Sequence, residues 1–483
     1  MVHEAATGDA HPVGDTGALP SAARRQTTAG ANGRVTPGPR RSNLYSWLPV
    51  HWPHTLVSGD TGNNIGTATL LLCSPTRLTS MRLGFPSIAP VPAIVPKAVV
   101  QPSTTINDGV NPTGGLRPSV FTFANGGADV RKVVDVNGAP TQITIAPNHT
   151  DPTSGQTIIP RWTWTDFVWV SDTTPDPTTG MYIYIIRHTL RDTGTITYMN
   201  GTLQGVGGII PWVLPNEAIN PVANGYDMCI GGYNNGWDCT NFEDMRRSYA
   251  LANGVGVNGS VVGCFQGYGD KPSIIGMIAG DSHHAGTSAT GGINNFVMQT
   301  TTIKGKGQLG RQPWGFASVA QPGARSDQIF AYLEAVMPAI NPTYVVLPGW
   351  SANEPGLDTA ADVVANDHFF GRLVQAADTV LQNGAIPIYV DPMPRDASFW
   401  NRSTLPPWIA LGARERTLRD LGVRVIGAQQ LLGNALNGAL EGTYKVASPA
   451  ITADNIHPND VGHGPNWLAG QFMATIDQLV TAI

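Results

Sequence analysis

The chain has 483 residues and a formal net charge of −5 at pH 7, and only 13% of its residues are charged. This length allows two or three domains, each with its own hydrophobic core. Glycine and proline are abundant, at 56 and 38 residues, which favours turn-rich β structure over a helical protein. The acidic balance offers no basic footprint for phosphates, so nucleic acid is not an expected partner.

Residues 1–43 are rich in Ala, Gly, Thr, Pro and Arg and show no apolar periodicity. Such a composition is typical of a disordered tail. The start of the chain lacks the apolar core of a secretory signal peptide, and no apolar run is as long as a membrane-spanning helix. We therefore expect no membrane insertion, and a soluble protein in the cytoplasm or exported by a non-standard route. No oligomeric state is predicted.

Residues 44–268 contain short β-like runs separated by Gly, Pro, Asn and Asp, which predicts an accessory domain resembling a β-sandwich of jelly-roll type. The runs cover residues 68–73, 77–85, 93–100, 119–124, 131–136, 141–146, 160–170, 181–190 and 195–199. Trp162 and Trp164 share one face of their run, as do Tyr182 and Tyr184. Such aromatic rows can stack on sugar rings, but cross-strand core packing is the favoured interpretation.

The chain has four cysteines, too few for a disulfide scaffold, and none lies in a C-x-x-C metal pattern. Cys229 and Cys239 could close a small loop, although buried free thiols are at least as common.

From residue 269 the sequence pattern changes to short apolar segments typical of strands, which alternate with loops and amphipathic helical segments. Strands alternating with helices predict a parallel sheet covered on both faces, and hence an α/β domain over residues 269–483. The segments that carry this pattern are 272–282, 316–337, 343–350, 368–384, 385–394, 414–427 and a last helix within 461–483.

Ser282 directly follows an apolar run, in the setting Gly280-Asp281-Ser282. A strand that ends in a tight Gly-x-Ser turn lifts a hydroxyl to the carboxyl edge of an α/β sheet. Serine needs an imidazole to accept its proton and a carboxylate to hold that imidazole in the right tautomer. Asp454 and His457 lie three residues apart near the end of the chain, so the sequence contains the parts of a serine hydrolase.

Four segments resemble, in order, the sequence blocks of the SGNH or GDSL hydrolase family. They are GDSHHAGT with Ser282, VAQPGARSDQI with Gly323, VVLPGWSANEP with Asn353, and DNIHPNDVGH with Asp454 and His457. The resemblance covers about residues 270 to 483. It implies a three-layer, flavodoxin-like α/β domain that needs no cofactor and no metal.

The resemblance also implies a role for each matching residue. Ser282 would be the nucleophile, His457 the general base and then the general acid, and Asp454 the carboxylate that orients the imidazole. The oxyanion hole would use the backbone N–H groups of Ser282 and Gly323 and the side-chain amide of Asn353. Such preorganised donors are worth on the order of 3 kcal/mol each.

The chain departs from the family pattern at two places. His283 stands where Leu usually follows Gly-Asp-Ser, and the third block has Ser-Ala-Asn-Glu, at residues 351–354, instead of Gly-x-Asn-Asp. Asp281 is expected to be a structural hydrogen-bond partner in its turn and not a second catalytic acid.

Several other histidines and glycines have competing interpretations. The pairs His283–His284 and His51–His54 lack a third ligand at zinc-like spacing, so no metal site is predicted. His463, six residues beyond His457 and followed by Gly464, is an alternative base, but a position at the start of the last helix is the favoured interpretation. The G-x-G-x-x-G matches at 254–259 and 305–310 neither follow a strand nor open a helix, so no dinucleotide site is expected.

The favoured function is a serine esterase that removes short, acetyl-type acyl groups from a carbohydrate or small molecule. One alternative is a structural or adhesive surface or virion protein that keeps a hydrolase-like fold only as a scaffold, since fold does not guarantee activity. Another is a lipase or thioesterase that uses the same chemistry.

Overall fold

The structure is a computed structural model of the chain. It describes residues 27–29, 35–37, 42–48, 56–58, 65–86, 93–95, 97–104, 116–134, 138–147, 149–150, 157–158, 162–177, 180, 182–191, 197–199, 230–231, 263–289, 294–305, 313–351, 353, 360–395, 417–434, 443–446 and 450–480.

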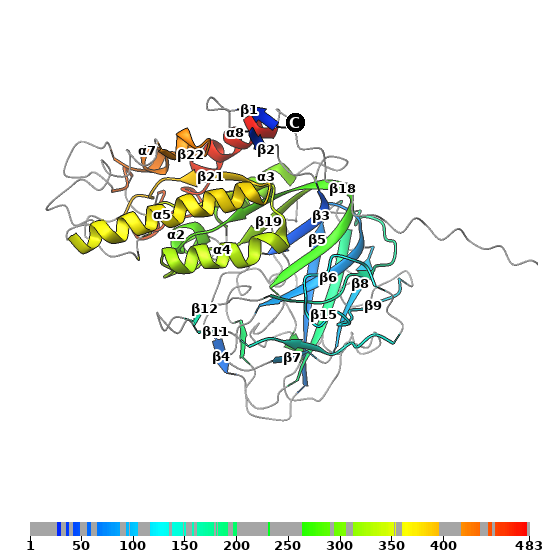
Figure 1. The fold of residues 1–483 in the computed structure, drawn as a ribbon. Coiled ribbons are helices and arrows are strands. Elements are labelled where there is room, and N and C mark those ends of the chain that lie inside the picture. Colours follow the sequence, from blue (N-terminus) through cyan, green and yellow to red (C-terminus); the bar gives the residue numbers. More distant parts are fainter. Residues whose placement is uncertain are drawn as a thin grey trace, which may run out of the picture.

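A nine-stranded sheet forms the centre of the described structure (Figure 1). Five of its strands are parallel in the spatial order β19(Trp314–Ser318), β18(Cys264–Ile278), β20(Tyr344–Leu347), β21(Ile386–Val390) and β22(Arg424–Ile426). Counted along the chain, this is the order 2-1-3-4-5 of flavodoxin-like doubly wound folds. A sixth strand, β3(Ser42–Leu48), also pairs in parallel with β19. The expected parallel α/β sheet is therefore confirmed.

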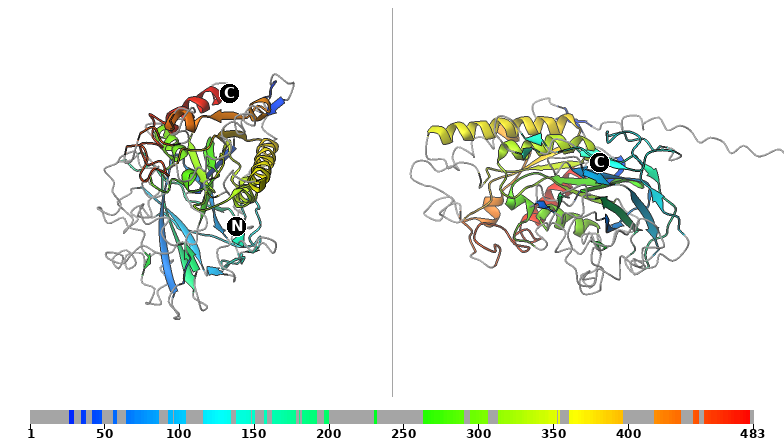
Figure 2. Two further views of the ribbon diagram at one scale, coloured as in Figure 1. Left: turned by 90° about the vertical axis from the view of Figure 1, so that its left-hand side faces the viewer. Right: turned by 90° about the horizontal axis from the view of Figure 1, so that it is seen from below.

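Helices cover both faces of the parallel strands. On one face α4(Ser326–Ile340) packs against α5(Ala360–Gln382), and on the other α3(Phe296–Gly305) packs against α8(Leu468–Val480). The right-hand view of Figure 2 shows α5 and α8 on opposite sides of the sheet. Because both faces are covered, the last five residues of β18, 274–278, form a continuous apolar run and are all buried.

The first half of β18 belongs to an antiparallel part of the same sheet. It pairs with β3(Ser42–Leu48) on one side and β6(Leu78–Pro86) on the other. Strands β13(Trp162–Trp164) and β14(Val168–Trp169) then pair with β6. The expected boundary between residues 268 and 269 thus falls inside β18, and a free-standing all-β domain is not confirmed.

A second sheet of five antiparallel strands accounts for several of the expected β runs. Its order is β17(Ile230–Gly231), β5(Ile65–Ser74), β15(Tyr182–Arg191), β8(Ala98–Ser103) and β9(Ser119–Val120). Residues 131–136 were expected to form a strand, but among the described residues of this run only an isolated bridge at Val133 is present. That the strands of residues 44–268 form one domain remains a prediction.

Four short antiparallel pairs complete the strands. They are β1(Thr27–Ala29) with β2(Val35–Pro37), β4(Leu56–Ser58) with β16(Thr197–Met199), β7(Ala93–Val95) with β10(Ile143–Ile145), and β11(His149–Thr150) with β12(Thr157–Ile158). Strands β1 and β2 and the start of β3 lie within the segment expected to be a disordered tail.

The tryptophans of β13 form part of the core. Trp162 and Trp164 are buried and stacked, with ring centroids 5.5 Å apart. The buried guanidinium of Arg82 lies 4.1 Å from the Trp164 ring centroid. Tyr184 is also buried, and its hydroxyl accepts the N–H of Leu78 at 2.7 Å. The core-packing interpretation is confirmed, and Trp162, Trp164 and Tyr184 are not exposed to stack on a sugar.

Side chains of β18 and β3, together with the loop residue Arg131, hold the C-terminal end of α4. The last carbonyls of a helix have no partner inside the helix. Here the carbonyl oxygen of Ala339 accepts from the side-chain amide of Gln266 at 2.9 Å and from the guanidinium of Arg131 at 3.0 Å. Ser46 donates to the carbonyl oxygen of Ile340 at 3.2 Å. The antiparallel strands and the helical layer are therefore tied together by direct hydrogen bonds.

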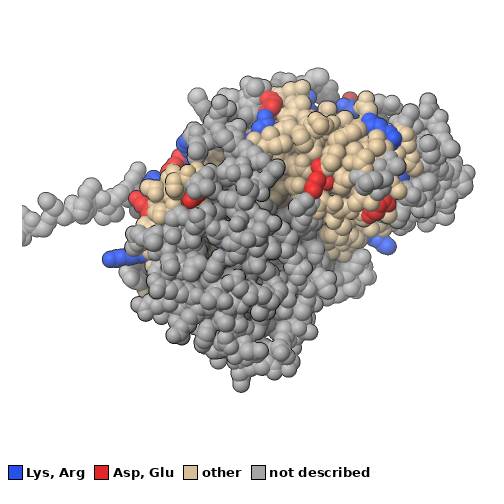
Figure 3. Space-filling view, turned by 180° about the vertical axis from the view of Figure 1, so that it is seen from behind, with Lys and Arg blue, Asp and Glu red and all other residues tan. Residues whose placement is uncertain are grey.

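On the face seen in Figure 3, the charged side chains that are drawn in colour are interspersed, with neither sign forming a large patch. None of the helices in the described ranges is long and apolar enough to cross a membrane. Cys264 is a buried free thiol. The pairs Cys229–Cys239 and His51–His54 and the glycine motif at 254–259 lie outside the described residues.

Candidate active site

Ser282 lies at the carboxyl end of β18, at the first position of the short helix α2(Ser282–Ala285). Its strand neighbours β20, and this is the point of the 2-1-3-4-5 order where doubly wound sheets place their ligands. Gly280 before it has a φ of +150°, and an added Cβ would lie 2.3 Å from the His284 ring. The tight turn therefore requires glycine at position 280. The Ser282 side chain that follows this turn is only 8% exposed.

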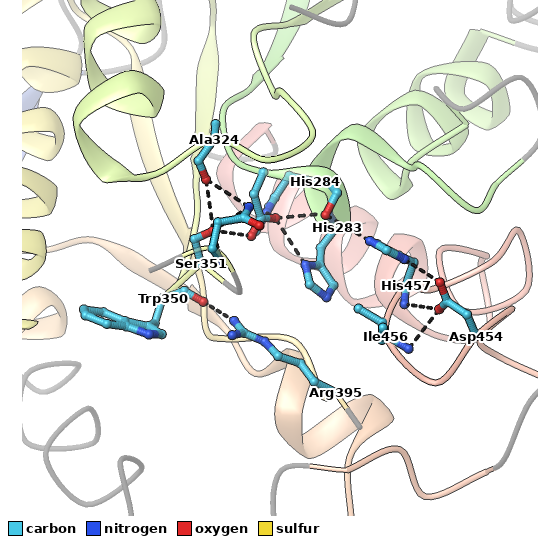
Figure 4. A network of polar contacts seen from close by, with 12 residues as sticks. His283, His284, Ala324, Trp350, Ser351, Arg395, Asp454, Ile456 and His457 are labelled. Carbon is cyan, nitrogen blue, oxygen red and sulfur yellow. Dashed lines mark hydrogen bonds and ion pairs between the residues drawn. The ribbon is translucent and has the colours of Figure 1, made fainter. Parts of the chain in front are cut away.

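The structure brings together the three residues that the sequence singled out. Nε2 of His457 lies 3.0 Å from Oγ of Ser282, and Nδ1 of His457 lies 2.7 Å from Oδ2 of Asp454. Figure 4 shows the imidazole of His457 between the Asp454 carboxylate and the end of β18. With Nδ1–H donated to the carboxylate, Nε2 is free to accept the serine proton.

The turn that follows Asp454 supplies hydrogen bonds to its carboxylate and lowers its pKa. Partial burial raises its pKa, but the backbone N–H and the imidazole of His457, together with the N–H of Ile456, outweigh that effect and lower the pKa overall. The two backbone N–H groups donate to Oδ1 at 2.7 and 2.9 Å. Asn455, which directly follows Asp454, has a φ of +63°, which lets the chain turn back within three residues. Asp454 is therefore ionised and aimed at His457.

The loop that carries His457 is held against α3. The side-chain amide of Asn294 donates to the Asp460 carboxylate at 2.7 Å, and that of Gln299 donates to the Asp460 carbonyl oxygen at 3.0 Å. On the other side, the Tyr444 hydroxyl donates to the carbonyl oxygen of Ile456 at 3.0 Å. Sequence reasoning missed these contacts, and it also missed α3 itself, whose residues 296–305 gave no strong apolar stripe.

Asp281 is a buried carboxylate with several donors. Its Oδ1 accepts the backbone N–H of His283 at 3.0 Å and faces Nδ1 of His283 and of His284 at 3.3 and 3.2 Å. Its Oδ2 accepts the Ser351 hydroxyl at 2.6 Å. Burial acts to raise its pKa, but the two imidazoles hold the pKa well below the usual range. The expected structural role for Asp281 matches these contacts.

The two remaining oxyanion-hole candidates lie on neighbouring turns. Gly323 is exposed, has a φ of +82°, and a Cβ there would meet no atom within 4 Å. Glycine is therefore needed for this backbone conformation and not for a close approach. The side-chain amide of Asn353 donates to the Ala324 carbonyl oxygen at 3.1 Å and to the Ser351 hydroxyl at 3.2 Å. These two hydrogen bonds join the Asn353 amide to the turns that carry Ala324 and Ser351.

Two further histidines, His283 and His463, lie near His457, but neither contacts the Ser282 hydroxyl in its place. The His283 ring lies 5.1 Å from the His457 ring, centroid to centroid, and burial lowers the pKa of His283. His463 is fully buried against Phe296, and burial lowers its pKa to about 3. His457, and not His463, bonds Ser282. Within the described part of the chain, no group of three or more His, Cys, Asp or Glu side chains is arranged to hold a metal ion.

Arg395 is a buried cation near this cluster that sequence reasoning missed. It donates to the carbonyl oxygen of Trp350, as Figure 4 shows. Burial lowers its pKa to about 10, while the charge of Asp281 acts in the opposite direction. Arg395 thus remains protonated at neutral pH, and its positive charge favours the ionised form of Asp281.

No family model and no curated protein matches the sequence. Solved structures do match part of it. A GDSL-like lipase from Bacteroides thetaiotaomicron is 16% identical over 43% of this chain and 89% of its own, with a TM-score of 0.30. A lipase/acylhydrolase from Enterococcus faecalis is 16% identical over 42% of this chain and 96% of its own, with a TM-score of 0.33. An acetyl xylan esterase is 16% identical over 42% of this chain and 100% of its own, with a TM-score of 0.31.

Proposed function

We propose that the chain is a serine esterase whose nucleophile is Ser282. The observation that carries this proposal is the continuous set of hydrogen bonds from Ser282 through His457 to Asp454, at 3.0 and 2.7 Å. A serine hydroxyl, an imidazole and an ionised carboxylate in this order form the arrangement that activates a serine for acyl transfer.

In the proposed reaction, Oγ of Ser282 attacks the carbonyl carbon of the ester while Nε2 of His457 takes the hydroxyl proton. The tetrahedral intermediate collapses to an acyl-enzyme, and His457 returns the proton to the leaving alcohol. A water molecule then attacks the acyl carbon and gives a proton to His457. The second tetrahedral intermediate collapses as His457 returns this proton to Oγ of Ser282, which releases the acid and the free serine. Asp454 stays ionised throughout and stabilises the imidazolium form of His457.

The proposed oxyanion hole uses the N–H groups of Ser282 and Gly323 and the amide of Asn353. Ser282 is the first residue of α2, so its backbone N–H has no hydrogen-bond partner within the helix. Backbone and amide donors fixed in place lower the energy of the negative oxygen without reorganising during the reaction.

For the substrate we propose a short acyl ester, of acetyl type, on a carbohydrate or small-molecule alcohol. A lipase or thioesterase would need to admit a long acyl chain at the same serine. The rate of hydrolysis across p-nitrophenyl esters from C2 to C12 separates these possibilities, and we expect a maximum at C2 to C4.

The direct test compares the wild-type chain with Ser282→Ala on p-nitrophenyl acetate. We expect kcat to fall by about 10⁴-fold or more, because a missing nucleophile removes the whole covalent route. Ser288→Ala, six residues further on, is the matched control and should keep wild-type turnover. Equal turnover in Ser282→Ala and wild type would exclude Ser282 as the nucleophile, and absence of turnover in the folded wild type would favour a scaffold without activity.

A further inference from the structure

The side chain of Ser351 connects three turns of the candidate site. Ser351 is 1% exposed and follows β20, the parallel neighbour of β18. Its hydroxyl lies 2.6 Å from Oδ2 of Asp281 and 3.1 Å from the carbonyl oxygen of Ala324. The backbone N–H and side-chain amide of Asn353 lie 3.1 and 3.2 Å from the same oxygen. One hydroxyl thus contacts the turns after β18, β19 and β20 (Figure 4).

The single hydroxyl hydrogen has one preferred acceptor. Hydrogen bonds to a charged group are roughly twice as strong as neutral ones, and the contact to Asp281 is also the shorter of the two. The Ser351 hydroxyl therefore donates to the Asp281 carboxylate. Its lone pairs are then turned towards Asn353, whose backbone N–H and side-chain N–H both donate to it.

Each residue fixed by this hydroxyl is, or directly neighbours, a proposed oxyanion donor. Asp281 precedes Ser282, and Ala324, which is linked to the hydroxyl through the Asn353 amide, follows Gly323. Asn353 is held twice, because its amide also donates to the Ala324 carbonyl oxygen at 3.1 Å. The longer amide contact, to Ser351 at 3.2 Å, is the one that an oxyanion would take over, and the backbone N–H of Asn353 would stay on Ser351.

We propose that Ser351 is a positioning residue that sets the three donors of the oxyanion hole relative to one another. The inference rests on the esterase function proposed above. Ser351 does not touch the reacting atoms, and it acts through Asn353 and Asp281. Because the hole is occupied fully only in the tetrahedral state, loss of this hydroxyl should affect kcat more than KM.

The test is a double-mutant cycle on p-nitrophenyl acetate with Ser351→Ala, Asn353→Ala and the double variant. We expect Ser351→Ala to lower kcat by about 10- to 100-fold with KM within about threefold, and to cost little more once Asn353 is already alanine. Ser351→Thr keeps the hydroxyl and should recover part of the loss. Thermal unfolding of each variant shows whether it is folded at the assay temperature.

Ser46→Ala is the matched control, since Ser46 is also fully buried and its hydroxyl also bonds two partners, Gln266 and Ile340, at the other end of the sheet. Its kcat should equal that of the wild type. The inference fails if Ser351→Ala keeps wild-type kcat, or if its loss is the same with and without Asn353. These outcomes require an active wild type and an inactive Ser282→Ala, so they are distinct from failure of the esterase proposal.

Discussion

Asp454 is the most exposed member of the Ser282–His457–Asp454 set, with 43% of its side chain accessible, against 18% for His457. Its role in orienting the imidazole leads to a prediction for Asp454→Asn. An amide can present its N–H to Nδ1 and favour the wrong tautomer, so we expect kcat to fall by between about 10²- and 10⁴-fold. Asp477→Asn is the control, because Asp477 on α8 is similarly exposed and pairs with Lys304 on α3. Equal kcat in Asp454→Asn and wild type would show that the carboxylate does not orient His457.

At this scale, sequence alone found the residues whose signal is local. Ser282 ends an apolar run, and Asp454 and His457 lie three residues apart. Ser351 could not be found in this way, because its partner Asp281 lies 70 residues away in the sequence. The bond between Asn294 and Asp460 spans 166 residues. Contacts of this kind depend on which strands become neighbours, and a single sequence does not state that.

The turn between β18 and α2 gives a prediction at the scale of the element. Gly280→Ala would place a Cβ against the His284 ring at a φ of +150°, so we expect the free energy of unfolding to fall by about 3 kcal/mol. Esterase activity should fall as well, because the displaced turn carries Ser282. Urea unfolding followed by circular dichroism measures the change in stability.

Gly371→Ala in α5 is the opposite case. A Cβ at Gly371 would meet no atom within 4 Å, and alanine favours a helix over glycine. We expect this variant to be more stable than the wild type by about 1 kcal/mol. If the two alanine variants changed stability by the same amount, the close contact of Gly280 with His284 would not be a constraint on the turn.

The elements of the α/β part were largely predictable, because period and turn residues marked β20, α5 and β21 clearly. The end of β18 was predicted, but its beginning was not. The strand runs for fifteen residues, Cys264–Ile278, and its first half pairs with β3 and β6. A change of rhythm near residue 269 in the sequence therefore marks a change of partner along one strand and not a break in the chain's structure.

The shared sheet gives a prediction for the whole molecule. A fragment of residues 269–483 would lack β3, β6 and the first half of β18, and it would also lose Gln266, Arg131 and Ser46 at the end of α4. We expect this fragment to unfold without cooperativity and to lack esterase activity, since new strand edges and apolar surface are exposed. A fragment with a sharp thermal transition and wild-type kcat on p-nitrophenyl acetate would show instead that the accessory strands form a separable module.

Stability of the whole chain should also depend on pH through His463. Burial lowers its pKa in the folded protein to about 3, whereas an unfolded histidine has a pKa of about 6.5. Between these values the unfolded chain binds the proton more tightly, so the free energy of unfolding decreases as the pH falls below about 6.5. The contribution approaches roughly 1.4 kcal/mol per pH unit.

His463→Phe removes this titration while keeping a ring against Phe296. We expect the urea midpoint of the variant to fall less than that of the wild type between pH 7 and pH 5. Identical pH slopes in the two proteins would mean that His463 is not buried in its neutral form.

The central claim, that Ser282 is an activated nucleophile, is tested most directly by covalent labelling of the full chain with a fluorophosphonate, followed by peptide mass spectrometry. We predict one equivalent of label on Ser282, much slower labelling in His457→Ala, and none in Ser282→Ala. Absence of label on Ser282 in a folded chain, or a label on another serine that accompanies ester hydrolysis, would contradict it.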